Sequence, residues 1–262
     1  MKQNGESRKE AIHPTNLLST RRITRVGTWN VRTMYEASKA AQISAERKAY
    51  HLDIIGLCET RWTGYGEQLL SSGDTVIYSG HVEQGAPHTL GVGIMMSSYA
   101  RSSLIDWKPR GPRMLTATFQ TAKPDIKLYI VVVYAPTNDS VPLAKDDFYN
   151  GLQDCLNGCN RRDMLILIGD FNAKLGKNNQ GFEEVMGQQG EGDTMSDNGE
   201  RFADACAANE LVIGGTIFPH KRIHKVTWVS PDNHTENQID HICIGKKFSP
   251  HYRMLGHTGG RM

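Results

Sequence analysis

The chain has 262 residues, of which 39% are hydrophobic and 22% are charged, and its formal net charge is +2. This length allows one sizeable hydrophobic core, and the composition is that of a globular protein, which excludes a disordered or fibrous chain. The first residues contain no apolar run typical of a signal peptide, and no stretch approaches the roughly 18 apolar residues that span a bilayer. We therefore expect no membrane partner and a nuclear or cytoplasmic protein that is not secreted.

The five cysteines include no Cys-x-x-Cys pair, and each lies among apolar neighbours. Free cysteine behaves as a small hydrophobic residue in a protein core. We therefore expect reduced thiols, as in proteins of the cytosol or nucleus.

The chain is expected to form one domain between two polar ends. Residues 1–20 are polar without periodicity, which predicts a disordered leader. Residues 21–248 contain no internal repeat and no linker, so they are predicted to form a single domain. Residues 249–262 are predicted to be a divergent tail.

The first half of this domain begins with a strand–helix–strand pattern. Residues 23–31 predict a strand, residues 37–50 are rich in helix formers, and residues 52–59 predict a second strand. Short apolar runs bounded by glycine, proline or serine then predict antiparallel strands at 75–78, 91–96 and 114–119.

The second half alternates strands and helices. Residues 127–134 are β-branched and almost wholly apolar, which is typical of a central strand covered on both faces. An apolar stripe with Pro142 in the first turn predicts a helix from 142 to about 161. The remaining predicted elements are a buried strand at 163–168, a helix at about 199–209, and strands at 211–213, 225–229 and 238–244. Together they predict an α/β domain with much antiparallel sheet.

The strand at 163–168 ends abruptly in a glycine followed by Asp170 and Asn172. Residues two apart on a strand point to the same face, so both polar side chains would lie together where the strand leaves the core. That is a usual place for a functional site. Gly-Asp-x-Asn also suits a tight turn, and the sequence leaves both interpretations open.

Four other predicted strands also end in, or are interrupted by, a polar side chain, namely Asn30, Glu59, Tyr134 and Asp240. If the strand ends converge, they would form a pocket of three carboxylates, two amides and a phenol. Such hard oxygen ligands favour Mg²⁺ or Mn²⁺ over zinc. Magnesium bound by carboxylates usually accompanies a substrate that contains phosphate.

Five motifs in a fixed order carry a family resemblance. TWN, CETRW, YAPT, GDFNA and IDHI, over about residues 23–247, resemble the endonuclease/exonuclease/phosphatase superfamily. The similarity is strongest to the apurinic-endonuclease-like domains of non-LTR retrotransposons and their host-encoded, craniofacial-development-protein-like relatives. The resemblance implies a DNase I-like fold of mixed α+β type, a four-layer sandwich of two mixed β-sheets flanked by helices. It also implies a Mg²⁺-dependent phosphodiesterase that acts as a DNA endonuclease, with DNA as its partner.

The same resemblance implies a role for each polar strand end. Glu59 would be the main magnesium ligand, with Asn30 beside it. Asp170 would hold or deprotonate the attacking water, or protonate the leaving oxygen. Asn172 and Tyr134 would donate hydrogen bonds to the phosphate as negative charge develops on its oxygens.

The resemblance also assigns Asp240 the role of orienting a histidine from a later Ser-Asp-His motif. The sequence after residue 247 contains no such motif, and His251 and His257 follow proline and glycine. His241 adjoins Asp240, but consecutive strand residues point to opposite faces, so it is expected to face away from the site. We therefore expect the 262-residue chain to bind magnesium and to cleave DNA weakly or not at all.

Several residues near these motifs are candidate substrate contacts. Arg32 and Arg61 follow the presumed ligands and are expected to contact the DNA backbone, and Thr227 would donate to a phosphate. Trp62 and Trp228 would line the groove, although tryptophan is more often a core residue. His88, in a separate loop, is either a substrate contact or an exposed loop residue.

Two alternative functions stay open at this stage. Sphingomyelinases and inositol-phosphate 5-phosphatases share the superfamily, but CETRW and YAPTND favour the nuclease branch. The chain could also be a domesticated, non-catalytic binding or scaffold domain of the same fold. Salt-dependent binding to DNA without cleavage would indicate the latter.

Overall fold

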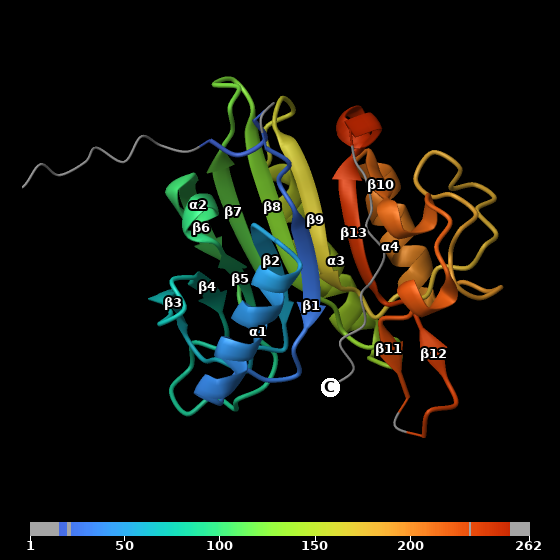
Figure 1. Ribbon diagram of the computed structural model, residues 1–262. Coiled ribbons are helices and arrows are strands. Elements are labelled where there is room, and N and C mark those ends of the chain that lie inside the picture. Colours follow the sequence, from blue (N-terminus) through green and yellow to red (C-terminus); the bar gives the residue numbers. More distant parts are fainter. Residues whose placement is uncertain (1–15, 20–21, 231, 252–262) are drawn as a thin grey trace, which may run out of the picture.

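The computed structural model describes residues 16–19, 22–230 and 232–251. Two large β-sheets pack face to face, and helices cover their outer faces (Figure 1). Helix α1 (Ala37–Ala49) packs on the first sheet, and helices α3 (Pro142–Asn157) and α4 (Asp197–Ala208) pack on the second. The predicted four-layer α/β sandwich is therefore confirmed.

The first sheet has five strands and is mixed. Its order is β1 (Val26–Asn30), β2 (Ile54–Cys58), β5 (Val92–Met96), β4 (Thr75–Ser79) and β3 (Tyr65–Leu69). Strands β1 and β2 are parallel, and the other pairs are antiparallel. As a result, the C-terminal ends of β1 and β2 and the N-terminal end of β5 lie at the same edge of the sheet.

The second sheet has six strands and is also mixed. Its order is β10 (Leu211–Ile213), β13 (Asp240–Gly245), β9 (Met164–Asp170), β8 (Lys127–Tyr134), β7 (Met114–Gln120) and β6 (Leu104–Pro109). Strands β8 and β9 are parallel, so Tyr134 lies in register with Asp170, and antiparallel β13 places Asp240 opposite Asp170 on the other side. Three sequence-distant polar residues thus reach one end of this sheet.

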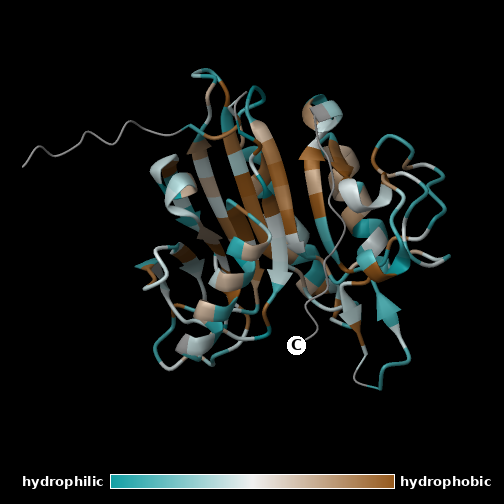
Figure 2. Cartoon of the chain, viewed as in Figure 1, coloured by the Kyte–Doolittle hydropathy of each residue, from teal (hydrophilic) through white to brown (hydrophobic). Residues whose placement is uncertain are grey.

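The near-continuous apolar strands follow from this layering. In β2, Ile54 and Cys58 face the core between the two sheets, whereas Ile55 and Leu57 face α1. Both faces of the strand are therefore buried, and alternation with polar residues is lost. Figure 2 shows the central strands as mostly hydrophobic and the loops at their ends as mostly hydrophilic.

The remaining elements are short. They are helix α2 (Ser98–Ser102), the two-stranded ribbon of β11 (Trp228–Val229) and β12 (Glu236–Asn237), and the 3₁₀ helices η1 (Gly214–Thr216), η2 (Arg222–His224) and η3 (Lys246–His251). No helix in the described part of the chain is both long enough and apolar enough to cross a membrane. All five cysteines are free thiols.

Several predicted boundaries were wrong. The helix predicted to reach about residue 161 ends at Asn157, with Gly158 as its C-cap. The strand predicted at 225–229 is reduced to β11, because a 3₁₀ helix precedes it. Strands β3 and β6 were missed because most of their side chains are exposed, and their sequences show no regular apolar alternation.

The predicted disordered leader needs a partial correction. Leu17 is fully buried in the core between the sheets and pairs with Thr121 in an isolated bridge. Burial of one leucine supplies local order that the polar composition around it did not indicate. Residues 1–15, 20–21, 231 and 252–262 lie outside the described residues, so the domain boundaries at 21, 248 and 249 stay predictions.

Candidate active site

The end of β1, the residue after β2 and the end of β9 meet in one hydrogen-bonded group. The Asn30 side-chain Nδ2 donates to Glu59 Oε1 and to Asp170 Oδ2, both at 2.8 Å. The structure therefore brings together residues of both sheets, and Asn30 and Asp170 are 140 positions apart in the sequence. Their chemical roles stay predictions, but the side chains share one site.

Asp170 serves the turn and the site at the same time. Its Oδ1 accepts a hydrogen bond from the backbone N–H of Asn172 at 2.9 Å, which closes a local turn, while its Oδ2 faces Asn30. The turn interpretation of Gly-Asp-x-Asn is therefore confirmed, and the functional interpretation stays a prediction. Gly169 makes this turn possible for two reasons. Its φ of +145° is a conformation that residues with a side chain rarely adopt, and a Cβ atom there would lie 1.9 Å from the carbonyl oxygen of Val133.

Strained backbone is concentrated at the candidate residues. Within the described residues, nine non-glycine residues have a positive φ, and four of these are predicted site residues: Arg32, Glu59, Arg61 and Asn172. Such a conformation costs roughly 1–3 kcal/mol per residue and persists only where the surroundings enforce it. Its clustering is independent support for a functional site, and no sequence pattern indicated it.

The site concentrates negative charge in a partly dry environment. Asp170 is 2% exposed, and burial raises its pKa to about 6, with hydrogen bonds from Asn30 and Asn172 opposing the shift and the Glu59 charge adding to it. Burial, and then the Asp170 charge, raise the pKa of Asp240 well above its ordinary value. The Arg61 guanidinium lies 3.7 Å from Glu59 Oε2 and offsets only part of this charge.

This donor set fits magnesium. In the described residues, no three His, Cys, Asp or Glu side chains are close enough to hold one ion together. The candidate ligands stay those that the resemblance implies, the partly exposed Glu59 carboxylate and the amide oxygen of Asn30, beside the buried acids. Magnesium commonly binds through one or two carboxylates and keeps several waters, which matches so small a set of oxygen ligands.

Tyr134 belongs to the same group, together with a neighbour, Arg113, that no sequence pattern indicated. Burial, followed by the Glu59 and Asp170 charges, raises the pKa of Tyr134 above its ordinary value. The Arg113 guanidinium lies 5.3 Å from the centre of the Tyr134 ring and donates to the Tyr134 carbonyl oxygen at 3.0 Å. Arg113 therefore fixes this strand end and adds a positive charge behind the phenol.

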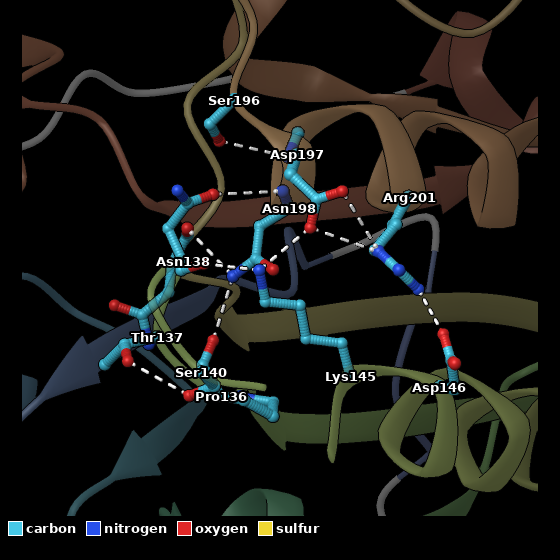
Figure 3. Close-up of polar contacts among 12 residues, drawn as sticks. Pro136, Thr137, Asn138, Ser140, Lys145, Asp146, Ser196, Asp197, Asn198 and Arg201 are labelled. Carbon is cyan, nitrogen blue, oxygen red and sulfur yellow. Dashed lines mark hydrogen bonds and ion pairs between the residues drawn. The ribbon is translucent and has the colours of Figure 1, made fainter. Parts of the chain in front are cut away.

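Asn198 holds two of the site loops together (Figure 3). It is 1% exposed, and its Nδ2 donates to the carbonyl oxygens of Pro136 at 2.9 Å and Asn172 at 3.2 Å. Asn172 in turn donates from its own Nδ2 to the Ala135 carbonyl oxygen at 3.0 Å. Buried Lys145 bonds Asp197 and the Asn138 carbonyl oxygen, which ties α3 to α4 beside these loops.

Asp240 has an unsatisfied oxygen. Its Oδ1 is buried and has no hydrogen-bond partner within the described residues, although the Thr227 hydroxyl bonds the residue and opposes the rise in its pKa. The neighbouring His241 faces the opposite side, as expected, where its Nε2 lies 2.8 Å from the Ala173 carbonyl oxygen and its ring packs near Phe171 and Phe202. His241 therefore cannot serve as the partner of Asp240.

The buried position of His241 predicts an acid-sensitive fold. Burial lowers its pKa from 6.5 to about 4, so the unfolded chain binds the proton more tightly. The stability contributed by the neutral His241 ring is fully present above pH 6.5, the pKa of histidine in the unfolded chain. It is lost as the pH falls from there toward about 4, the pKa in the folded protein. Between about pH 7.5 and about pH 5 we expect this residue to cost about 2 kcal/mol of unfolding free energy.

Urea unfolding of the wild type and of His241→Gln at both pH values measures this contribution. Glutamine keeps an N–H donor for the Ala173 carbonyl oxygen but does not titrate. The loss of stability on acidification should therefore be smaller in the variant by about 2 kcal/mol. Equal losses in the two proteins would contradict the assignment.

The predicted substrate contacts differ in their placement. Arg32 and Arg61 are exposed and adjoin the candidate ligands, and the backbone N–H of Arg32 donates to Asn30 Oδ1. The Thr227 oxygen instead accepts from the backbone N–H of Ile239 and Asp240, so it also supports the start of β13. Trp228 pairs with residue 237 in the β11–β12 ribbon. Contact of any of them with substrate stays a prediction.

Comparisons with known proteins agree with this fold. A model of the Endonuclease/Exonuclease/phosphatase family matches residues 27–255. Craniofacial development protein 2 of Bos taurus is 36% identical over 229 residues, which cover 85% of this chain and 36% of that protein. The chain therefore spans little more than a third of this curated relative.

Two solved structures show the same fold at low identity. The endonuclease domain of TRAS1, a telomere-specific non-LTR retrotransposon, has a TM-score of 0.57 and 15% identity, covering 87% of this chain and 88% of that one. The 3′ phosphatase NExo from Neisseria, bound to a product DNA hairpin, has a TM-score of 0.62 and 17% identity, covering 87% and 89%.

Proposed function

Because the chain belongs to the endonuclease/exonuclease/phosphatase family, we propose that it is a magnesium-dependent phosphodiesterase that nicks DNA. The observation that carries the proposal is the bonded group of Asn30, Glu59 and Asp170, drawn from both sheets. The strained backbone of Glu59 in the same place adds to it. A fold maintained only for stability has no need of buried acids beside such strain.

Each residue has a role that suits hydrolysis of a phosphodiester. Glu59 and Asn30 would hold Mg²⁺ (or Mn²⁺), which when bound neutralises charge on the phosphate oxygens. Asp170, desolvated and held by two hydrogen bonds, would hold or deprotonate the attacking water, or protonate the leaving oxygen.

Hydrogen bonds to the phosphate would come from Tyr134 and Asn172. The Tyr134 phenol is protonated at neutral pH and bonds the Glu59 carboxylate, and it would turn this O–H to the phosphate once Glu59 binds the cation. Asn172 uses its amide nitrogen to bond the Ala135 carbonyl oxygen, which leaves its second N–H for the substrate. Both groups are fixed before substrate arrives, so they need little reorganisation as charge develops.

DNA is the substrate that the surroundings favour. Exposed Arg32 and Arg61 next to the candidate ligands suit a polyanionic backbone. TRAS1 is described as a telomere-specific non-LTR retrotransposon, and NExo is described as a 3′ phosphatase bound to a product DNA hairpin. A retrotransposon-related DNA endonuclease of apurinic-endonuclease-like type is therefore our proposal, acting in the nucleus or cytoplasm, where five free thiols are stable.

A second candidate, a non-catalytic nucleic-acid-binding or protein-binding domain, is favoured by one observation. The buried Oδ1 of Asp240 lacks a partner in the part of the chain that the structure describes. A buried acid that orients no histidine leaves the phosphate without a charged donor, and losing such a donor costs on the order of 100-fold to 1,000-fold in rate. Binding would survive such a loss better than turnover.

Incubation of the purified protein with supercoiled plasmid distinguishes these candidates. The proposal predicts nicked circles in Mg²⁺ or Mn²⁺ and none in EDTA. Binding that weakens with salt, without nicking, would select the non-catalytic candidate. Absence of both nicking and binding would contradict the nuclease and the nucleic-acid-binding candidate, and would leave the protein-binding one.

A further inference from the structure

A small open pocket lies beside the loop that follows Glu59. Its volume is about 260 Å³. It is lined by Tyr35, Trp62, Thr63, Gln68, Tyr78 and His88. This volume is near the lower end of the roughly 300–1,000 Å³ typical of small-molecule pockets, so it suits a single planar ring.

Aromatic side chains form most of the pocket wall. Trp62 and Tyr78 meet edge to face, with ring centres 4.9 Å apart and planes at 86°. Tyr35 and His88 make a second such pair at 4.9 Å and 74°, and Tyr35 is 68% exposed. The exposed Tyr35 ring therefore offers a face for stacking on a planar ligand.

The pocket is tied to the candidate active site through the backbone. Trp62 lies three residues after Glu59, and its Nε1 donates to the Met34 carbonyl oxygen at 2.8 Å, in the loop that follows Asn30. His88 Nδ1 lies 3.1 Å from the carbonyl oxygen of Arg61. The pocket wall and the candidate magnesium ligands therefore share the loops at one edge of the first sheet.

The chemistry of the wall selects among ligands. Among the described residues no carboxylate lines the pocket, so no ion pair there favours a cationic group, while Thr63 and Gln68 in its lining offer hydrogen bonds. Arg61, with an exposed guanidinium, lies next to Trp62 in the chain and is available to a phosphate. A neutral planar ring attached to a phosphate backbone satisfies all of these features.

We propose that this pocket binds one unpaired nucleobase of the DNA substrate by stacking, beside the candidate active site. The inference rests on the proposed nucleic-acid function and adds to it a preference for DNA with an unpaired or extruded base. A base that is stacked within a duplex cannot enter a pocket of ring size, so single-stranded or distorted DNA supplies the ligand.

The test is fluorescence anisotropy in EDTA with two labelled probes, a 12-nucleotide oligodeoxythymidylate and a blunt duplex. Stacking is worth roughly 1–3 kcal/mol per base, so Tyr35→Ala and His88→Ala should each weaken binding of the single strand about tenfold. Tyr35→Phe, which keeps the ring, should bind as the wild type does. Binding of the duplex should change less than about twofold in every variant.

Tyr65→Ala is the matched control, because Tyr65 is 60% exposed on strand β3 and does not line the pocket. Equal effects of Tyr65→Ala and Tyr35→Ala, equal weakening of both probes, or no binding of the single strand by the wild type would overturn the proposal. The assay contains no divalent metal. A failure here is therefore separate from a failure of metal-dependent nicking, which would count against the proposed function.

Discussion

A Glu59→Gln variant is expected to lose magnesium-dependent nicking by on the order of 100-fold or more. Glutamine has the shape of glutamate and can still accept the hydrogen bond from Asn30 Nδ2, so the strand ends should stay together. What it lacks is the charge that would hold the cation. The rate of conversion of supercoiled to nicked plasmid measures the effect, and calorimetric titration with Mn²⁺ measures the accompanying loss of metal affinity.

Glu83→Gln is the control for this variant. The Glu83 side chain is 74% exposed and lies within ion-pair distance of His81, at 3.9 Å, so its replacement should leave both nicking and Mn²⁺ affinity at wild-type values. Normal Mn²⁺ affinity in Glu59→Gln would show that Glu59 is not the main ligand. Unchanged nicking by Glu59→Gln would contradict the catalytic assignment of Glu59.

The strand ends of the candidate site could be predicted because burial leaves a clear signal. Strands β2, β8 and β9 are apolar on both faces, so Glu59, Tyr134 and Asp170 stand out where each run stops. The parallel pairing of β8 with β9 then brings two of these ends into register. Periodicity was enough for an α/β domain with much antiparallel sheet, whereas the four layers and the meeting of these side chains were implied by the family resemblance that the ordered motifs carry.

Other features depend on contacts that no local pattern encodes. Arg113 precedes an ordinary strand, and its importance arises only because the Tyr134 ring lies beneath it. Asn198 sits in a helix N-terminus typical of capping sequences, yet its side chain joins two loops far earlier in the chain. The strands β3 and β6 escaped notice because exposed edge strands need no apolar alternation.

Backbone strain is also hidden from sequence patterns. Only asparagine among the four strained site residues is a type that readily adopts a positive φ, and the arginines and glutamate do not favour it. Their conformation is imposed by hydrogen bonds such as that from the Arg61 N–H to the Leu90 carbonyl oxygen. Tertiary structure, rather than local propensity, therefore sets the direction of these side chains.

Gly169→Ala should be the most destabilising small substitution in the candidate site. A Cβ atom there would lie 1.9 Å from the Val133 carbonyl oxygen and 2.9 Å from its backbone nitrogen, and these atoms belong to the neighbouring strand β8. A strand backbone cannot rotate away as a side chain can, and the φ of +145° is itself unfavourable for alanine. We expect a loss on the order of 3 kcal/mol of unfolding free energy, measured by urea denaturation.

Gly73→Ala separates the two causes of this loss. Gly73 has a φ of +85°, but a Cβ atom there would meet no atom of the described residues within 4 Å, so alanine at this position meets strain without a clash. Its cost should be about 1 kcal/mol. If both variants lost the same stability, close approach of β8 would not be the reason for glycine at 169. If instead Gly169→Ala alone is severe, and the folded fraction that survives nicks DNA poorly, then the glycine is needed both for strand packing and for aiming Asp170 at Asn30.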